Sequence, residues 1–376
     1  MRILVISIYV FLFFRCSQSN ELKDAGIEKY KIDTLMIDSG SDIIYLKENL
    51  TYSGLSIDQK KLFNIDVEQL KLQIIDLETA RLEKEVLLER EGPNGIGDWF
   101  IGFKVWDDST FVLQGDNRFY KVDLEGNLKE KIGFDHLFYV QEELAKRFGH
   151  TGFKIHQNKI YNVITTFGKP EFNLLIYDFK EDVYELKEIP GSENLISSTV
   201  ITYLGKSSFT YVTGFSIVDF SDDFILHNRS YPQMAVYRTN SDSIQLINSI
   251  SNFYEDVPKV DKIKEVHSEK ESEDFKRDLE KRMSFLIPIW DEENQKIFRW
   301  GYKLSSINVE MENPEYDNYL FVMDKDLNIV EEFLIPEFRI KPYRIFIVDN
   351  QIYLYHNFED ELGFIRVRLD FLKTGP

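Results

Sequence analysis

The chain has 376 residues, and its content of 43% hydrophobic and 14% aromatic residues excludes a disordered polymer, because it can bury a large core. Its formal net charge is −19, with 64 acidic against 45 basic residues. Such a surface repels a phosphate backbone, so we expect no nucleic-acid partner, and we interpret the acidity as a source of solubility.

The N-terminal segment predicts export. An apolar run from Ile3 to Phe14, broken only by Ser7, follows the initial Met-Arg pair. The run is too short for a comfortable membrane span and has the length of a signal-peptide core, so residues 1–15 are assigned to a signal peptide. Cys16 follows and is the only cysteine, which excludes a disulfide within one molecule.

The position of Cys16 resembles that of the lipid-modified cysteine of a bacterial lipoprotein, which becomes the mature N-terminus. Arg15 departs from that pattern, in which a small residue normally precedes the cysteine. We expect Cys16 to be lipidated and the protein to be anchored to the outer membrane, facing the periplasm or the cell surface. Ordinary secretion and an uncleaved anchor are the alternatives.

The next segment, residues 16–41, is polar and charged and is expected to be a lipidated N-terminus and tether. Within it, Tyr30 to Ile37 alternates in polarity, so this piece either belongs to the tether or closes a ring of repeats. Residues 42–376 are assigned to a single domain.

A β-hairpin recurs through that domain. Its clearest copy is Ser109 to Asn127, with a strand at Phe111 to Leu113, a turn at Gly115 to Asn117, and a second strand at Phe119 to Leu124. The six copies have first strands at Lys61–Asn64, Phe111–Leu113, Ile160–Val163, Phe224–His227, Lys296–Arg299 and Ile352–Leu354, and second strands at Leu72–Glu78, Phe119–Leu124, Leu174–Phe179, Met234–Tyr237, Leu320–Asp324 and Phe364–Leu369.

The spacing of these copies predicts an all-β, six-bladed β-propeller. Successive copies start about 48 to 72 residues apart, which is at or above the length of one four-stranded antiparallel blade. A solenoid needs tighter periods, and a sandwich does not need the same hairpin six times. Closing the ring also removes the exposed strand edges.

The largest insertion, residues 257–283, separates the fourth and fifth copies. It is dense in Lys and Glu, and Phe275, Leu279 and Met283 are spaced four apart, on one face of a helix. We predict a short amphipathic helix on the rim of the propeller. A structural subunit docked through this charged helix is the alternative to a helix that is only solvated.

Short motifs also suggest a family. They are Cys16 after the apolar leader, the Glu91–Gly95 loop after the first blade, the strand-Asp turns Ile75–Leu77 and Val122–Leu124, and Trp290-Asp291 with Phe298–Trp300. With these features the chain resembles an uncharacterised family of Gram-negative bacterial lipoproteins, a domain of unknown function that resembles six-bladed β-propellers. The resemblance covers most of the mature chain and implies a fold and an address, without a mechanism.

The sequence lacks the HExxH, phosphate-loop and nucleophile-elbow motifs. The six histidines form no HExxH pair, and the spacing of His150 and His156 does not suit one helical face, so no metal is expected. The chain has no phosphate-binding Gly-rich loop and no nucleophile elbow, and its single cysteine belongs to the leader. We therefore expect no cofactor and assign no catalytic residue.

Acidic residues leave an enzymatic alternative open. Asp107-Asp108, Asp222-Asp223 and Asp291 to Glu293 lie beside strands, where turns are the default explanation. The alternative is a hydrolase or lyase that acts on glycans or peptides through carboxylates in the central channel. Asp324 to Asn328 matches the start of a calcium loop but lacks the Gly and the distal Glu, so a calcium site there is a weaker possibility.

A propeller usually binds its ligand at the mouth of the central channel. Four polar residues beside apolar strands are candidates: Arg118, His227, Arg229 and Arg299. Arginines there suit an anionic ligand, and the alternative is salt bridges to the Asp-rich turns. The sequence thus favours a binding or interaction module for a protein, peptide or glycan of unknown identity.

Overall fold

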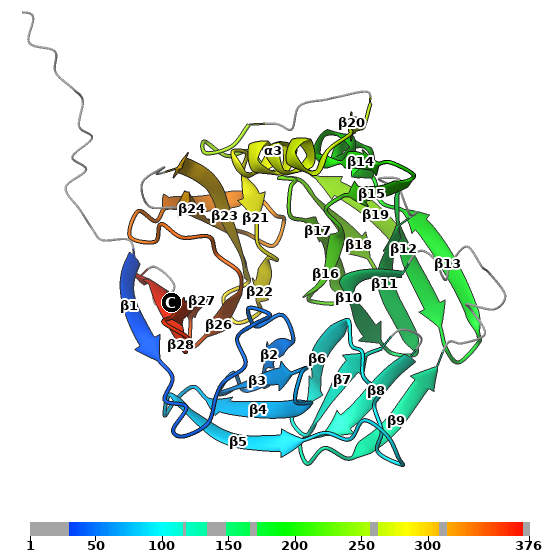
Figure 1. The fold of residues 1–376 in the computed structure, drawn as a ribbon, viewed down its shortest axis with the longest axis vertical. Helices are drawn as coiled ribbons and strands as arrows, with labels where there is room; N and C mark the ends of the chain where they lie inside the picture. The colour runs from blue at the N-terminus through cyan, green and yellow to red at the C-terminus, as the bar shows by residue number, and fades with distance from the viewer. Residues whose placement is uncertain are drawn as a thin grey trace, which may run out of the picture.

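The computed structural model describes residues 30–115, 118–133, 148–165, 171–255, 262–307 and 314–370. Its strands form seven sheets, and six of these are arranged as blades around one axis (Figure 1). The predicted all-β fold, a six-bladed propeller of mainly four-stranded antiparallel blades, is confirmed. Two residues of the turn expected in the second hairpin, Asp116 and Asn117, lie outside the described ranges.

Each of the first four blades is a four-stranded antiparallel sheet whose first strand lies nearest the axis (Figure 1). Blade one contains β2 (Ser53–Leu55), β3 (Lys61–Asp66), β4 (Lys71–Asp76) and β5 (Arg81–Leu87); blade two contains β6 (Gly102–Asp107), β7 (Thr110–Gln114), β8 (Arg118–Asp123) and β9 (Leu128–Gly133); blade three contains β10 (Phe148–His156), β11 (Lys159–Thr165), β12 (Phe172–Asp178) and β13 (Val183–Glu188); blade four contains β16 (Phe215–Phe220), β17 (Asp223–Asn228), β18 (Met234–Arg238) and β19 (Ser243–Ile247).

Blade five has a divided inner strand. Two short strands, β21 (Ser284–Phe285) and β22 (Ile289–Asp291), both pair with the long strand β23 (Lys296–Ile307). Pro288 lies between them and lacks the backbone N–H that a continuous ladder would need. The blade is completed by β24 (Pro314–Met323) and β25 (Ile329–Leu334).

Blade six joins the two ends of the chain. It contains β26 (Ile345–Val348), β27 (Gln351–Phe358), β28 (Glu361–Leu369) and, as its outer strand, β1 (Tyr30–Met36). β1 pairs antiparallel with β28, from Tyr30 opposite Leu369 to Met36 opposite Gly363. This strand falls in the range expected to be a tether, so the blades include residues from Tyr30 onward rather than from residue 42. It closes the ring because it covers the edge that β28 would otherwise expose.

The six predicted hairpins are the two middle strands of the six blades. These strands are largely buried, as in β7, where every residue is buried, because both of their faces pack against neighbouring blades. The outer strands are polar, as in β5, and the inner ones can be as short as the three residues of β2. Strands that are polar or this short lack the apolar pattern from which the hairpins were predicted, although the inner strand β26 is apolar and buried throughout.

The apolar core lies between blades. At the junction of blades four and five, for example, Val236 of β18 packs in one cluster with Phe285, Ile297 and Phe321 of blade five. Burying each such side chain contributes roughly 1.5–3 kcal/mol. This junction is therefore a fixed frame, and the candidate site is built on it.

Two insertions meet on one side of the ring and form a cap over blade four (Figure 1). The first, between blades three and four, contains the 3-10 helix η1 (Ser192–Ser198), β14 (Val200–Leu204) and β15 (Ser207–Tyr211); the second, between blades four and five, contains β20 (Lys264–Val266) and α3 (Glu269–Glu280). β14 pairs antiparallel with β15 and parallel with β20, which joins the two insertions in one sheet.

The helix predicted in the insertion of residues 257–283 is α3, although residues 257–261 lie outside the described part. Ser268 caps its first turn, because the Ser268 Oγ atom accepts from the backbone N–H of Glu271 at 3.2 Å. The helix lies on the rim between blades four and five, as expected (Figure 1). Of the predicted apolar residues, Met283 is buried beyond the end of the helix, while Phe275 and Leu279 are half-buried.

Candidate functional site

Three of the four residues predicted to bind a ligand come together between blades four and five. His227 lies in β17, Arg229 follows that strand, and Arg299 lies in β23 of the next blade. The Nη2 atom of Arg299 is 3.1 Å from Nδ1 of His227. Arg118, the fourth, begins β8 of blade two and is not part of this group.

Arg299 is a cation buried without a carboxylate partner among the described residues. Its side chain is 0% exposed. It donates from Nη1 to the carbonyl oxygen of Pro232, and from Nη2 to that of Tyr231 at 2.6 Å. Its guanidinium carbon lies 3.8 Å from the centre of the Phe285 ring. Burial lowers the pKa of Arg299, yet carbonyl oxygens and an aromatic face are groups that hold a guanidinium in its charged form.

His227 is neutral in this setting. Burial, and then the neighbouring positive charge of Arg299, lower the pKa of His227 well below its usual value. Its Nδ1 atom therefore accepts the hydrogen bond from Arg299. An uncharged, buried imidazole can position the guanidinium but adds no positive charge for an anion.

Arg229 connects the two blades by both its backbone and its side chain. Its carbonyl oxygen accepts from the backbone N–H of Phe285 at 2.8 Å, and its Nε atom donates to the hydroxyl of Tyr302 at 3.0 Å. The salt bridges to Asp-rich turns, considered as an alternative for these arginines, are therefore not what engages Arg229 and Arg299. Carbonyl and phenol oxygens accept their hydrogen bonds instead.

A pocket of about 300 Å³ opens beside this group, which we call the rim pocket. Three cations line it: Lys281 and Arg282, just beyond α3, and Lys303 of β23. Glu255 is the one carboxylate among the residues that line it. Positive charge thus exceeds negative charge in this hollow, in a chain whose net charge is −19.

Two of these cations have no carboxylate within 4 Å among the described residues. The Nη1 atom of Arg282 donates to the carbonyl oxygen of Ser197 in the cap at 3.3 Å, and the ammonium of Lys303 lies 5.3 Å from the Tyr319 ring. Only Lys281 is paired, through its contact of 2.6 Å with the exposed Asp278. Arg282 and Lys303 therefore keep donors for an incoming anion.

Aromatic side chains form the apolar part of the rim pocket. Phe285 and Tyr254 pack edge to face, with ring centres 5.5 Å apart. Phe253 packs against Tyr319 with ring centres 4.9 Å apart. Because Arg299 lies against Phe285, it supports the pocket from behind instead of lining it.

The wall that carries Lys281 and Arg282 is anchored at the end of α3. Glu280 accepts hydrogen bonds from the hydroxyl of Tyr316 at 3.1 Å and from Nζ of Lys341 at 2.5 Å. Tyr316 belongs to β24, and Lys341 to the connection between blades five and six. The two cations therefore follow directly after a residue that is held in place.

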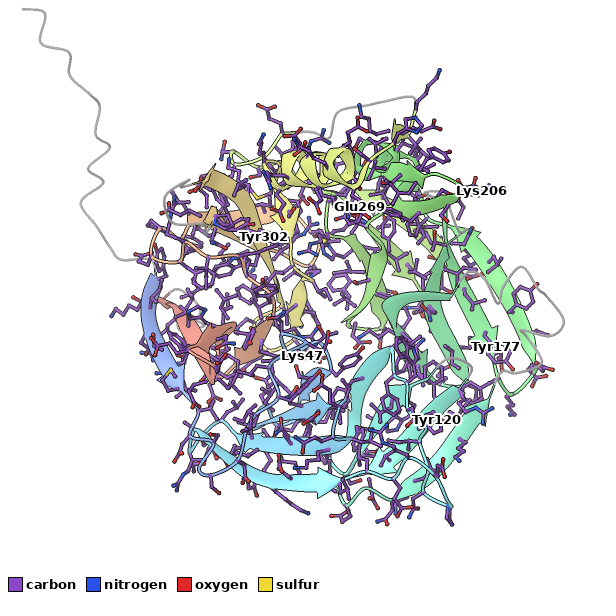
Figure 2. The ribbon with its side chains drawn as sticks, viewed as in Figure 1. Lys47, Tyr120, Tyr177, Lys206, Glu269 and Tyr302 are labelled. Atoms are coloured by element: carbon purple, nitrogen blue, oxygen red, sulfur yellow. The ribbon has the colours of Figure 1, made fainter. Side chains whose placement is uncertain are left out.

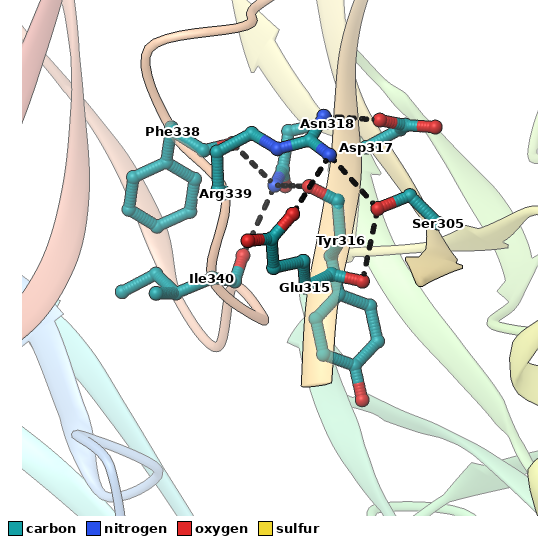
Figure 3. A network of polar contacts seen from close by, with 8 residues as sticks. All are labelled: Ser305, Glu315, Tyr316, Asp317, Asn318, Phe338, Arg339 and Ile340. Carbon is teal, nitrogen blue, oxygen red and sulfur yellow. Dashed lines mark hydrogen bonds and ion pairs between the residues drawn. The ribbon is translucent and has the colours of Figure 1, made fainter. Parts of the chain in front are cut away.

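The connection between blades five and six is itself held by the network in Figure 3. Arg339 forms ion pairs with Asp317 and with Glu315, the latter at 3.2 Å. Asn318 donates from Nδ2 to the carbonyl oxygens of Phe338 at 2.8 Å and Ile340 at 3.0 Å. These contacts fix the segment that leads to Lys341.

Asp residues of the acidic clusters that supported the enzymatic alternative accept hydrogen bonds within the scaffold, mostly in turns. The Oδ1 atom of Asp107 accepts from the backbone N–H of Ser109 at 2.9 Å. Similar local bonds run from Asn294 to Asp291 at 3.1 Å, and from Asp326 and Asn328 to Asp324 at 2.9 Å. Asp223 differs, because at the start of β17 it accepts from Thr239, beyond the end of the neighbouring strand β18, at 2.9 Å. The turn interpretation is confirmed for Asp107, Asp291 and Asp324, the last of which begins the stretch considered for calcium.

The part of the chain that the structure describes contains no candidate metal site and no helix that could span a membrane. Its His, Cys, Asp and Glu side chains form no group of three or more that could hold a metal ion. No helix in the same part is long and apolar enough to cross a membrane. Cys16 and the expected signal peptide lie outside the described residues, so lipidation stays a prediction.

Sequence reasoning missed the three cations of the rim pocket. Lys281 and Arg282 end the charged insertion that was recognised, but the pattern held no information on what the end of a surface helix would face. Nothing in the sequence singles out Lys303, because it is one of several polar residues in strand β23.

Comparison with known proteins supports the fold. The model of a family described as "Domain of unknown function (DUF4221)" matches residues 25–334. The crystal structure of a DUF4221 member from Bacteroides vulgatus ATCC 8482 is similar, with a TM-score of 0.65 and 15% identity over 91% of this chain and 99% of that one. A protein from Bacteroides fragilis NCTC 9343, for which export is suggested, has a TM-score of 0.48 and 10% identity over 91% and 96% of the two chains. No curated protein matches this sequence.

Proposed function

We propose that this protein, which belongs to the family described as a domain of unknown function (DUF4221), is a binding module for a small anionic ligand. The observation that carries the proposal is the rim pocket, where Lys281, Arg282 and Lys303 face a single carboxylate, Glu255. An acidic surface repels anions, so a local excess of positive charge in a hollow marks the place where an anion is favoured.

The lining suggests the class of ligand. A carboxylate placed between Arg282 and Lys303 would form charge-assisted hydrogen bonds, each contributing about 1.5–3 kcal/mol. The rings of Phe253 and Tyr254 suit a flat apolar group attached to it. A volume of about 300 Å³ is at the lower end for small-molecule sites. The ligand is therefore a small aromatic carboxylate, free or at the C-terminus of a peptide.

Isothermal titration with N-acetylphenylalanine and its amide tests this proposal. The two probes have nearly the same shape, but only the first carries a negative charge. We expect N-acetylphenylalanine to bind at least ten times more tightly than the amide and to raise the melting temperature. A peptide that ends in phenylalanine distinguishes the two sources, because it binds more tightly than the amino acid only if the natural ligand is a peptide.

Two variants locate the binding. Lys303→Met and Arg282→Met each remove one cationic group and are expected to weaken binding of N-acetylphenylalanine about tenfold, the equivalent of about 1.4 kcal/mol. The matched control is Lys206→Met, since Lys206 is exposed and lies at the outer edge of the cap (Figure 2). Equal affinity in all three variants, or equal binding of acid and amide, would refute an anion site in the rim pocket.

Anchoring outside the cytoplasm is the second part of the proposal. It is supported by the apolar run from Ile3 to Phe14 and by the position of Cys16 directly behind it. Mass spectrometry of the mature N-terminus checks it, with a lipid-modified Cys16 as the expected result. An unmodified Cys16, or cleavage at another residue, contradicts the lipid anchor and favours ordinary secretion.

A further inference from the structure

Three inner strands bring together two lysines and one aspartate near the axis. Lys104 lies in β6 of blade two, Lys154 in β10 of blade three and Asp219 in β16 of blade four. The Oδ2 atom of Asp219 is 2.5 Å from Nζ of Lys154 and 3.5 Å from Nζ of Lys104. We call these three residues the axial cluster. They lie on different strands from those that form the rim pocket.

The axial cluster has one positive charge in excess. Both ammonium groups share one carboxylate oxygen, and no other carboxylate of the described residues lies within 4 Å of either. The nearest acidic residue along β6, Asp107, is paired with Lys121 of β8 at 3.4 Å. The charges that act on Lys104 are thus those of Lys154 and Asp219. The single negative charge of Asp219 cannot neutralise both lysines, so one positive charge remains.

The excess charge is partly shielded from water but can be reached. The side chains of Lys104 and Lys154 are 26% and 15% exposed, while that of Asp219 is 55% exposed. Burial, and then the charge of Lys154, lower the pKa of Lys104 to about 8. Burial alone would raise the pKa of Asp219, but Lys154 and Lys104 together lower it, so Asp219 stays ionised.

We propose that the axial cluster binds a small, singly charged oxyanion of the carboxylate or dihydrogen phosphate type between Lys104 and Lys154. Such an ion neutralises the one excess charge and accepts hydrogen bonds from ammonium donors that Asp219 leaves open. Asp219 repels a second negative charge, so the site favours monoanions over dianions. It is a second ligand site, independent of the rim pocket.

The test measures the melting temperature of the full-length protein against acetate, phosphate and sulfate at constant ionic strength. Acetate is expected to stabilise the protein in a saturable way at pH 7, and sulfate to do so at least five times more weakly. Tighter binding of phosphate than of acetate at pH 6 identifies a phosphate-type ligand, and the reverse order a carboxylate. The absence of saturable stabilisation by any monoanion overturns the proposal.

The affinity depends on pH in a defined direction. A protonated Lys104 is needed for binding, so acetate affinity falls as pH rises through about 8 and is up to about tenfold weaker at pH 9 than at pH 7. Lys104→Met removes both acetate binding and its pH dependence, whereas Lys303→Met in the rim pocket leaves both unchanged. Acetate affinity that is unaffected by Lys104→Met contradicts the site.

A measurement on the unaltered protein avoids variants that fail to fold. Trace acetylation with acetic anhydride at pH 8 is expected to label Lys104 faster than the exposed Lys206. The lowered pKa of Lys104 leaves its amine more deprotonated at that pH than an ordinary lysine side chain is. Saturating acetate is expected to slow labelling of Lys104 at least threefold and to leave Lys206 unchanged. Labelling of Lys104 that acetate does not change also overturns the proposal.

Discussion

The guanidinium carbon of Arg299 lies 3.8 Å from the centre of the Phe285 ring, in a contact that joins a buried cation to the aromatic side of the rim pocket. The carbonyl groups that Arg299 binds belong to Tyr231 and Pro232, in the connection between β17 and β18. One side chain of blade five therefore holds both a loop of blade four and a ring that faces the pocket. We regard Arg299 as a positioning residue.

Replacement of Arg299 is expected to destabilise the protein. Arg299→Met removes the cation that donates to the buried carbonyls of Tyr231 and Pro232. We expect this to lower the free energy of unfolding by about 3 kcal/mol, measured by urea unfolding. Arg299→Lys keeps the charge, but an ammonium group cannot reach several carbonyls in one plane. Its urea midpoint should therefore lie between those of Arg299→Met and the wild type. The exposed Lys206→Met is the control, with a change within about 0.5 kcal/mol. An Arg299→Met midpoint equal to that of the wild type contradicts this role.

Glu280 should control ligand binding without touching the ligand. Burial and Glu280 together raise the pKa of Tyr316, so its hydroxyl keeps its proton and donates to the carboxylate. Glu280→Gln weakens this bond and the contact with Lys341. Lys281 and Arg282 follow directly in the chain, so they are then held less firmly. We expect about fivefold weaker binding of N-acetylphenylalanine by titration calorimetry, the equivalent of about 1 kcal/mol.

The control for Glu280 lies on the same helix. Glu273 is exposed, and Glu273→Gln changes the net charge by the same amount as Glu280→Gln. It is expected to leave the affinity within a factor of two. Equal effects of the two variants would mean that net charge, and not the anchoring of α3, sets the affinity.

The pairing of β1 with β28 predicts how far the N-terminus can be shortened. A chain that begins after Met36 leaves β28 as an open edge and exposes apolar groups that Ile32 covers, so its melting temperature should fall by about 10 °C or more. A chain that begins at residue 29 keeps the strand and should melt as the full-length protein does. Equal melting of the two shortened chains would show that closure by β1 contributes little.

Asp123 predicts part of the response to acid. Burial alone would raise the pKa of Asp123, but hydrogen bonds from Lys129 and Asn127 outweigh it and lower the pKa to about 2. The folded-state pKa is thus below that of the unfolded chain, about 4. The ionised carboxylate therefore contributes stability that is present above about pH 4 and lost as the pH falls through about 2.

Urea unfolding between pH 7 and pH 2 checks this contribution. Asp123→Asn is expected to be less stable than the wild type at pH 7, and the difference should shrink as the pH falls from about 4 to about 2. Asp222→Asn is the control, since Asp222 is exposed and its side chain has no ion pair among the described residues. A difference that stays constant down to pH 2 would argue against a lowered pKa at Asp123.

The sequence by itself determined the middle strands of the blades and therefore the fold. Strands such as β7 and β11 are packed on both faces, so they consist mainly of apolar, β-branched and aromatic residues that can be recognised without a structure. The same holds for the turns, because an Asp at the end of a strand accepts backbone N–H groups within a few residues, as Asp123 does. Such interactions are local, and local interactions leave a local pattern.

Only the tertiary structure decided which polar residues meet. The joining of β14 to β20, the approach of Lys281 to Lys303, and the grouping of the axial cluster each connect segments of different blades or insertions. The sequence around a single lysine in a strand shows the same pattern whether that lysine faces solvent or another lysine. Two of the three arginines chosen from the sequence, Arg229 and Arg299, accordingly lie close to the rim pocket but do not line it, because the neighbours of Arg299 come from a loop that no periodicity describes.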